Sequence, residues 1–185
     1  SRLRRALGGD VRLHGDATGY RLEVASGQVD LYEFEELAGL GRERLLAGQL
    51  GEAERALSAA LALWRGPAVP DLTAHGVGED VALRLAEARR TAREDHLSAR
   101  LDLGRFVETL PEAEALVSRE PQRERPVELL MRALAGNGRT ADALAAYDVF
   151  RERLADELGL DPSEHLRRVH LRLLRGELVP GGPVP

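Results

Sequence analysis

The sequence predicts a mainly α-helical protein built from antiparallel, tetratricopeptide-like helix pairs, preceded by a short helix end and a β-hairpin. Three observations lead to this prediction. Apolar residues recur at helical spacing almost to the end of the chain, with few β-branched runs. Glycines separate the helical segments at intervals that suggest a repeat. Near the N-terminus, by contrast, apolar and polar residues alternate as they do in strands.

Composition excludes several classes of protein. The 185 residues are 43% apolar, enough for one globular domain with a small additional piece. The chain has no cysteine, which excludes disulfides and thiolate metal sites, and no apolar run long enough to span a membrane. We therefore expect a soluble cytoplasmic protein without a bound cofactor.

Charge is divided unevenly along the chain. Residues 1–25 contain five arginines and three carboxylates, a net of +2, whereas the whole chain carries −5 and its remainder therefore −7. An acidic surface repels phosphate groups at long range. Contact with nucleic acid is therefore predicted for the N-terminal piece, and the acidic remainder is better suited to protein partners.

Helix boundaries follow from the apolar spacing and from the breakers between the segments. We predict helices at about residues 31–46, 50–65, 79–103, 106–119, 124–135 and 140–158, and a last helix that begins near residue 162. Asp30 and Asp161 are expected to cap the first and the last of these, with Pro162 in the first turn. Residues 66–78 contain two prolines and three glycines, which predicts a loop.

Three glycines between predicted helices indicate the repeat. Gly51, Gly104 and Gly138 are each followed by a leucine six residues later, and Gly104 and Gly138 are 34 residues apart, the tetratricopeptide period. The first interval, 53 residues, is explained by the 66–78 loop and a longer helix. Glycine at these turns is predicted to let two helices approach closely. The alternative is that each is an ordinary residue at a helix C-terminus.

The N-terminal stretch has a pattern of its own. Leu3 and Leu7 are spaced as on one helical face, with arginines on the other faces. Apolar residues then alternate with polar ones over residues 11–14 and 20–24, on either side of a turn. This pattern predicts a short helix followed by a β-hairpin, which is incomplete as a domain.

Several stretches carry a resemblance to known families. SRLRRAL (1–7) and VRLHGDATGYRL (11–22) resemble the end of the recognition helix and the wing of a response-regulator-type winged-helix domain. VDLYEFEEL (29–37), ALALWRGPAVPDL (60–72), ARLDLGR (99–105) and the segment 141–174 are similar to the bacterial transcriptional activator domain of the Streptomyces antibiotic regulatory proteins. The last segment is the most specific, because it keeps the family's order and spacing without a gap.

The resemblance implies a domain organisation and a function. Residues 1–25 would be the remnant of the winged helix, 26–176 the tetratricopeptide-like activator domain, and 177–185 a Pro/Gly-rich linker or tail. The implied function is that of a transcriptional activator, which in this family controls secondary-metabolite genes. Promoter DNA would be bound through the winged helix, and RNA polymerase or another protomer, as in a homodimer, through the helical domain.

The residues expected to contact DNA follow from this organisation. They are basic residues of the N-terminal piece, namely Arg2, Arg4, Arg5, Arg12, His14 and Arg21. The alternative for any one of them is a solvated side chain on a small domain. Because the N-terminal half of the recognition helix is absent from these 185 residues, we expect the chain by itself to bind DNA weakly or not at all.

Other polar and aromatic residues give no catalytic pattern. Trp64 could be an exposed anchor for a partner, but its position on the apolar face of its helix favours the core, as for Tyr147 and Phe150. His165 and His170 are five residues apart on one helix and cannot share a metal ion. We therefore predict no enzyme. The second function that the sequence allows is a stand-alone helical-repeat adaptor that binds a peptide.

Overall fold

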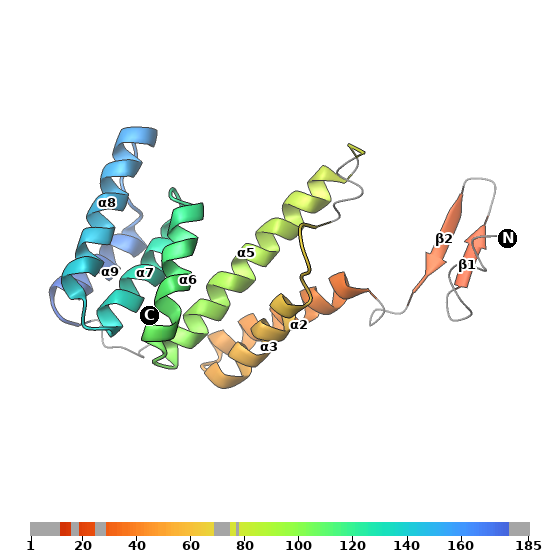
Figure 1. Ribbon diagram of the computed structural model, residues 1–185, viewed down its shortest axis with the longest axis horizontal. Helices are drawn as coiled ribbons and strands as arrows, with labels where there is room; N and C mark the ends of the chain where they lie inside the picture. The colour runs from red at the N-terminus through yellow and green to blue at the C-terminus, as the bar shows by residue number, and fades with distance from the viewer. Residues whose placement is uncertain (1–11, 16–18, 25–28, 69–74, 77, 178–185) are drawn as a thin grey trace.

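The computed structural model describes residues 12–15, 19–24, 29–68, 75–76 and 78–177 (Figure 1). In chain order its elements are β1 (Arg12–Gly15), β2 (Tyr20–Glu23), α2 (Asp30–Leu46), α3 (Leu50–Ala62), α5 (Glu79–Asp102), α6 (Phe106–Arg119), α7 (Glu124–Gly136), α8 (Thr140–Leu158) and α9 (Glu164–Leu174). The predicted mainly α-helical fold with a β-hairpin is confirmed. The helix predicted near Leu3 and Leu7 and the tail after residue 177 lie outside the described residues.

Three details of the helix ends differ from the prediction. The helix expected to reach residue 65 ends at Ala62, because the chain tightens there into turns that join residues three apart. Asp30 is the first residue of α2 and does not cap it from outside. At α9 the cap is Ser163, two residues beyond the predicted Asp161, and its hydroxyl accepts a bond from the Leu166 N–H at 3.3 Å.

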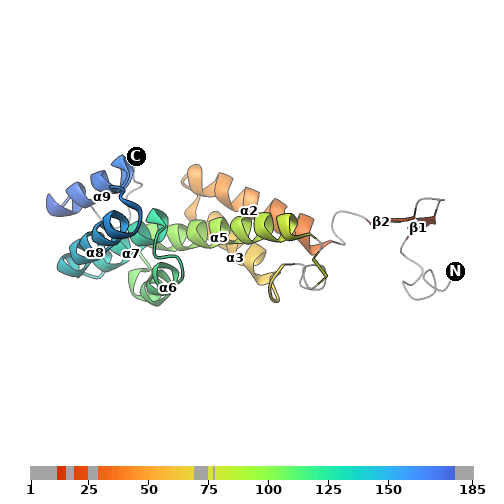
Figure 2. The same ribbon diagram turned by 90° about the horizontal axis from the view of Figure 1, so that it is seen from above.

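The helices stack in a regular order. They form the pairs α2/α3, α5/α6 and α7/α8, and the second helix of each pair also packs on the first helix of the next. The first helices α2, α5, α7 and α9 contact one another in a row, which Figure 2 shows from above. This order, in which each element touches only its neighbours in the stack, is that of a helical-repeat protein.

The turn that ends each first helix has the same geometry. A glycine with positive φ ends α2, α5, α7 and α9, namely Gly48, Gly104, Gly138 and Gly176. The N–H that follows each glycine bonds to a carbonyl five residues back, as Arg139 does to Leu134 at 2.9 Å. The repeat therefore passes through Gly48 and not through Gly51, because the left-handed backbone is required at residue 48.

Close approach of helices depends on two other glycines. A Cβ added at Gly51 would meet no atom within 4 Å, and the same is true at Gly138. At Gly41 an added Cβ would lie 2.5 Å from Cγ of Leu57, and at Gly136 it would lie 2.2 Å from Cδ1 of Phe106. Gly41 lets α3 pack on α2, and Gly136 lets α6 pack on α7. The predicted close approach of helices exists, but Gly41 and Gly136 provide it.

The buried apolar residues form two clusters. One contains Phe34, Ala53, Leu57, Ala60, Ala92 and Ala99, from α2, α3 and α5. The other lies among α5 to α9 and contains Tyr147 and Phe150, both buried as predicted. Helix α5 contributes to both clusters, because Ala92 and Ala99 belong to the first and Leu97 and Leu101 to the second.

We expect Gly136→Ala to lower the free energy of unfolding by about 2 kcal/mol, because the Phe106 ring must move to admit the methyl group. Gly51→Ala is the matched control. It adds a methyl group to open space and is expected to raise the free energy of unfolding by about 0.5 kcal/mol through helix propensity. Urea unfolding followed by circular dichroism measures both changes. Equal effects at the two positions would contradict the packing role of Gly136.

Candidate functional site

The N-terminal hairpin places polar side chains on one face. β1 and β2 are antiparallel, with Arg12 opposite Glu23 and His14 opposite Arg21. Opposed residues point to the same face of a two-stranded sheet, and so do residues two apart on one strand. His14 and Arg21 are exposed, and Nε2 of His14 lies 3.2 Å from a carboxylate oxygen of Glu23. This face can therefore present basic groups to an anion, with Glu23 partly offsetting their charge.

The other face of the hairpin is apolar and uncovered by the described helices. Tyr20 and Leu22 are 67% and 46% exposed, and Figure 1 shows the hairpin standing clear of the helical body. An isolated two-stranded hairpin is only marginally stable in water. An apolar face of this kind is suited to packing against the rest of a larger domain.

The structure places only some of the residues predicted to contact DNA. His14 and Arg21 lie together on the polar face of the hairpin. Arg2, Arg4 and Arg5 lie outside the described residues, and for Arg12 only the backbone in β1 is described. Their contact with DNA stays a prediction.

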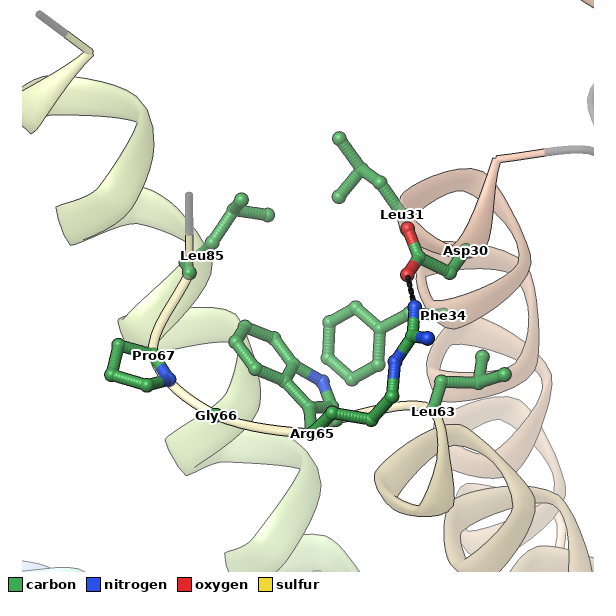
Figure 3. Close-up of a pocket in the computed structure, with 10 residues that line it drawn as sticks. Asp30, Leu31, Phe34, Leu63, Arg65, Gly66, Pro67 and Leu85 are labelled. Atoms are coloured by element: carbon green, nitrogen blue, oxygen red, sulfur yellow. Dashed lines mark hydrogen bonds and ion pairs between the residues drawn. The ribbon is translucent and has the colours of Figure 1, made fainter. Parts of the chain in front are cut away.

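A cavity of about 490 Å³ opens between the start of α2, the end of α3 and the start of α5 (Figure 3). Its apolar walls include Leu31, Phe34, Leu63, Trp64, Pro67 and Leu85. An ion pair between Arg65 and Asp30, at 3.1 Å, borders it. No local sequence pattern predicts this cavity, because its walls come from three segments that only the fold brings together.

Trp64 belongs both to the core and to the wall of the cavity. Its ring meets Phe34 edge to face at a centroid distance of 5.2 Å and packs against the first core cluster. The guanidinium carbon of Arg89 lies 4.5 Å from the Trp64 ring centroid, and Arg89 donates to the Gly66 carbonyl at 3.0 Å. Burial, and then the charge of Arg93, lower the pKa of Arg89. The cavity can receive an apolar side chain.

Ion pairs join successive first helices, in addition to the apolar contacts of the two clusters. Arg84 of α5 pairs with Glu35 of α2 at 2.8 Å. Further ion pairs in the row are Arg42–Asp95 at 3.5 Å, Arg123–Glu94 at 3.1 Å and Arg132–Asp102 at 2.5 Å. Nε2 of His165 also lies 3.1 Å from a carboxylate oxygen of Glu128. The row that a helical-repeat adaptor would use as its groove is thus lined with ion pairs.

Two buried glutamates in this row have pKa values shifted in opposite directions. Burial raises the pKa of Glu94, against the opposing charges of Arg123 and Arg125. Burial also acts to raise the pKa of Glu128, but the charge and hydrogen bonds of Arg125, with the charges of Arg132 and His165, outweigh it and lower the pKa. The difference arises because Glu128 receives two bonds from Arg125, at 2.9 and 2.8 Å.

Metal binding and membrane insertion find no support in the described part of the chain. None of its groups of histidine, aspartate and glutamate could hold a metal ion. His165 contacts Glu128, whereas His170 stacks on Tyr147 at a centroid distance of 4.0 Å, so the two histidines serve different contacts. None of its helices is long and apolar enough to cross a lipid bilayer.

We expect Glu128→Gln to lower the free energy of unfolding at pH 7 by about 2 kcal/mol, because a charged acceptor of two arginine bonds is lost. A carboxyl whose pKa is lowered on folding contributes stability above its unfolded pKa, and this contribution is lost as pH falls through its folded pKa. The variant should therefore approach the unchanged chain in stability on acidification. Urea unfolding at a series of pH values tests this.

Glu94→Gln should behave in the opposite way, because a carboxyl whose pKa is raised on folding contributes less stability as pH rises through that window. At pH 7 its free energy of unfolding is expected to equal or exceed that of the unchanged chain. Glu114→Gln, at an exposed glutamate of α6 without a described ion pair, is the control for both. Parallel pH profiles for all three variants would contradict the assignment.

Comparison with known proteins agrees with this architecture. The sequence is 39% identical over 160 residues to the regulatory protein DnrI of Streptomyces peucetius. This alignment covers 86% of this chain and 58% of DnrI. It is 37% identical over 180 residues to the transcriptional regulatory protein EmbR of Mycobacterium tuberculosis, over 95% of this chain and 46% of that one. The solved structure of EmbR in complex with a low-affinity phosphopeptide superposes with a TM-score of 0.83 at 35% identity, over 94% of this chain and 44% of that chain.

The chain thus spans about half the length of these relatives. Residues 29–174 match the family described as bacterial transcriptional activator domain, from the residue before α2 to the last residue of α9. The chain belongs to the bacterial transcriptional activator domain family.

Proposed function

We propose that the chain is part of a transcriptional activator whose helical body makes protein contacts beside a winged-helix DNA-binding domain. The observation that carries the proposal is the order of the two parts, a two-faced β-hairpin directly followed by the activator domain at residues 29–174. Control of secondary-metabolite genes is part of the proposal, because the resemblance to the Streptomyces antibiotic regulatory proteins implies it. Such a regulator acts in the cytoplasm, where bacterial DNA lies.

In this proposal the hairpin is the wing of the DNA-binding domain. Its apolar face, with Tyr20 and Leu22, packs on the rest of the winged helix, and its polar face turns to the DNA backbone. Arg21 and His14 are the described groups placed to meet phosphates.

The helical body supplies the protein contacts. Its net negative charge disfavours phosphate and favours basic or apolar protein surfaces. We propose RNA polymerase and a second protomer as its partners. The phosphopeptide named with EmbR belongs to that protein, of whose length this chain covers less than half.

The cavity beside Trp64 favours a second candidate, an adaptor that binds a peptide through an apolar side chain. This candidate needs no hairpin in front of the helices and no DNA. The regulator needs both, so the hairpin favours the regulator.

DNA binding measured by fluorescence anisotropy separates the two candidates. The assay compares this chain with a form extended upstream by its native sequence of about 70 residues, on a direct-repeat promoter fragment at several salt concentrations. The regulator predicts binding by the extended form only, with affinity that falls as salt rises. Absence of binding by both forms would favour the adaptor, and peptide capture would then test the cavity.

In the extended form, Arg21→Ala is expected to weaken DNA binding several-fold at every sequence and to lower the slope of log affinity against log salt by about 1, because one phosphate contact is lost. Arg55→Ala is the matched control, since Arg55 is equally exposed on α3 and has no described ion pair. The same loss from both variants would mean that overall charge is responsible and not the wing.

A further inference from the structure

Two arginines of α9 and the arginine that ends it form a basic stripe, of which the first and last members are exposed. Arg168, Arg172 and Arg175 fall within about 60° of arc at 100° per residue, and the first and last are about 10 Å apart along the helix. Arg168 and Arg175 are exposed, whereas Arg172 is half-buried and its Nη1 atom is buried without a described hydrogen-bond partner. None of the three pairs with a carboxylate in the described part of the chain, although most other arginines there do. Leu171, 47% exposed, borders the stripe.

An acidic stripe lies on α2. Glu33, Glu36 and Glu43 are exposed within about 80° of arc and have no ion pair with any described residue. Glu36 and Glu43 are seven residues apart, as Arg168 and Arg175 are. Tyr32 and Leu40, 51% and 39% exposed, lie on the same face.

The two stripes lie on the two ends of the stack. α2 is the first helix of the row and packs only on α3 and α5, whereas α9 is the last and packs on α7 and α8. Figures 1 and 2 show α9 at one end of the body and α2 toward the other. Within the row, successive helices are joined by arginine–carboxylate pairs such as Arg84–Glu35. The stripes on α2 and α9 can form the same arginine–carboxylate pairs with a helix of another molecule.

We propose that a second copy of this chain docks head to tail, with the exposed Arg168 and Arg175 of the basic stripe against Glu36 and Glu43 of α2. Opposite charge, the seven-residue spacing that Arg168 and Arg175 share with Glu36 and Glu43, and apolar neighbours on both faces make the two surfaces complementary. The contact continues the row of first helices from one copy into the next. It deepens the proposed function, in which a second protomer is one partner of the helical body.

The symmetry of this contact has a measurable consequence. Different patches meet, so the interface is heterologous and does not close on itself at two copies. Association should therefore continue beyond the dimer as concentration rises. Because the pairs are exposed, it should be weak and strongly reduced by salt.

Sedimentation velocity of the 185-residue chain without DNA tests the proposal, over about 5 to about 500 µM at about 20 mM and about 500 mM salt. The expected result is a sedimentation coefficient that rises with concentration at low salt and not at high salt. A monomer throughout the range at low salt would overturn the proposal. Since no DNA is present, this failure would leave the proposed DNA binding untouched.

Charge reversal gives the sharper test. Arg168→Glu with Arg175→Glu makes both stripes acidic, and Glu36→Arg with Glu43→Arg makes both basic, so each variant alone should associate at least about tenfold more weakly. An equimolar mixture of the two variants should associate again, because each then meets a stripe of opposite charge. Failure of the mixture to associate, with both variants folded by circular dichroism, would overturn the proposal.

Matched controls separate the stripes from overall charge. Arg55→Glu with Arg119→Glu, and Glu114→Arg with Asp156→Arg, make the same charge changes at exposed residues without described ion pairs on other helices. These variants should associate as the unchanged chain does. An equal loss in the controls would show that net charge governs association and would contradict the assignment to α2 and α9.

Discussion

Helix α5 is the constraint on which the rest of the structure depends. It has 24 residues, about 36 Å of helix, and is the one described helix whose side chains enter both core clusters. Ala92 and Ala99 face α2 and α3, whereas Leu97 and Leu101 face the helices that follow. Because a helix of this length bends little, it fixes the position of one core relative to the other. The buried guanidinium of Arg132, held to Asp102 and Ser98, then seats α7 on its C-terminal half.

Apolar packing and ion pairs both hold the helices of the stack together. Apolar side chains and two close-packed glycines form the cores between the helices, and ion pairs add to the contacts between the first helices. Apolar packing supplies most of the free energy of such a stack, since a partly exposed ion pair contributes little. The ion pairs act on specificity instead, because a helix placed out of order would leave charges such as Glu94 or Arg132 buried and unpaired.

The proposed function separates DNA and protein contacts in space. The hairpin and the start of α2 lie at one end of the molecule, and α9 with its arginines lies at the other (Figure 1). A basic wing at one end can sit on DNA while the acidic body extends away from the phosphates. The body is thereby free to contact other proteins. In the proposed association, the opposite charges of α2 and α9 orient one copy head to tail on the next.

The sequence by itself determined the helices, the hairpin and the family, because these depend on local periodicity, on breakers and on short motifs that neighbouring residues carry. It placed Tyr147 and Phe150 in the core, since apolar spacing on one helix reports which face is buried. Only the tertiary structure decided that Gly41 and Gly136, and not Gly51, allow close packing, because the Leu57 and Phe106 side chains that meet them come from other helices. The cavity beside Trp64, the ion pairs of the first helices and the opposed stripes of α2 and α9 likewise depend on groups distant in sequence. No local pattern encodes which of them the fold brings together.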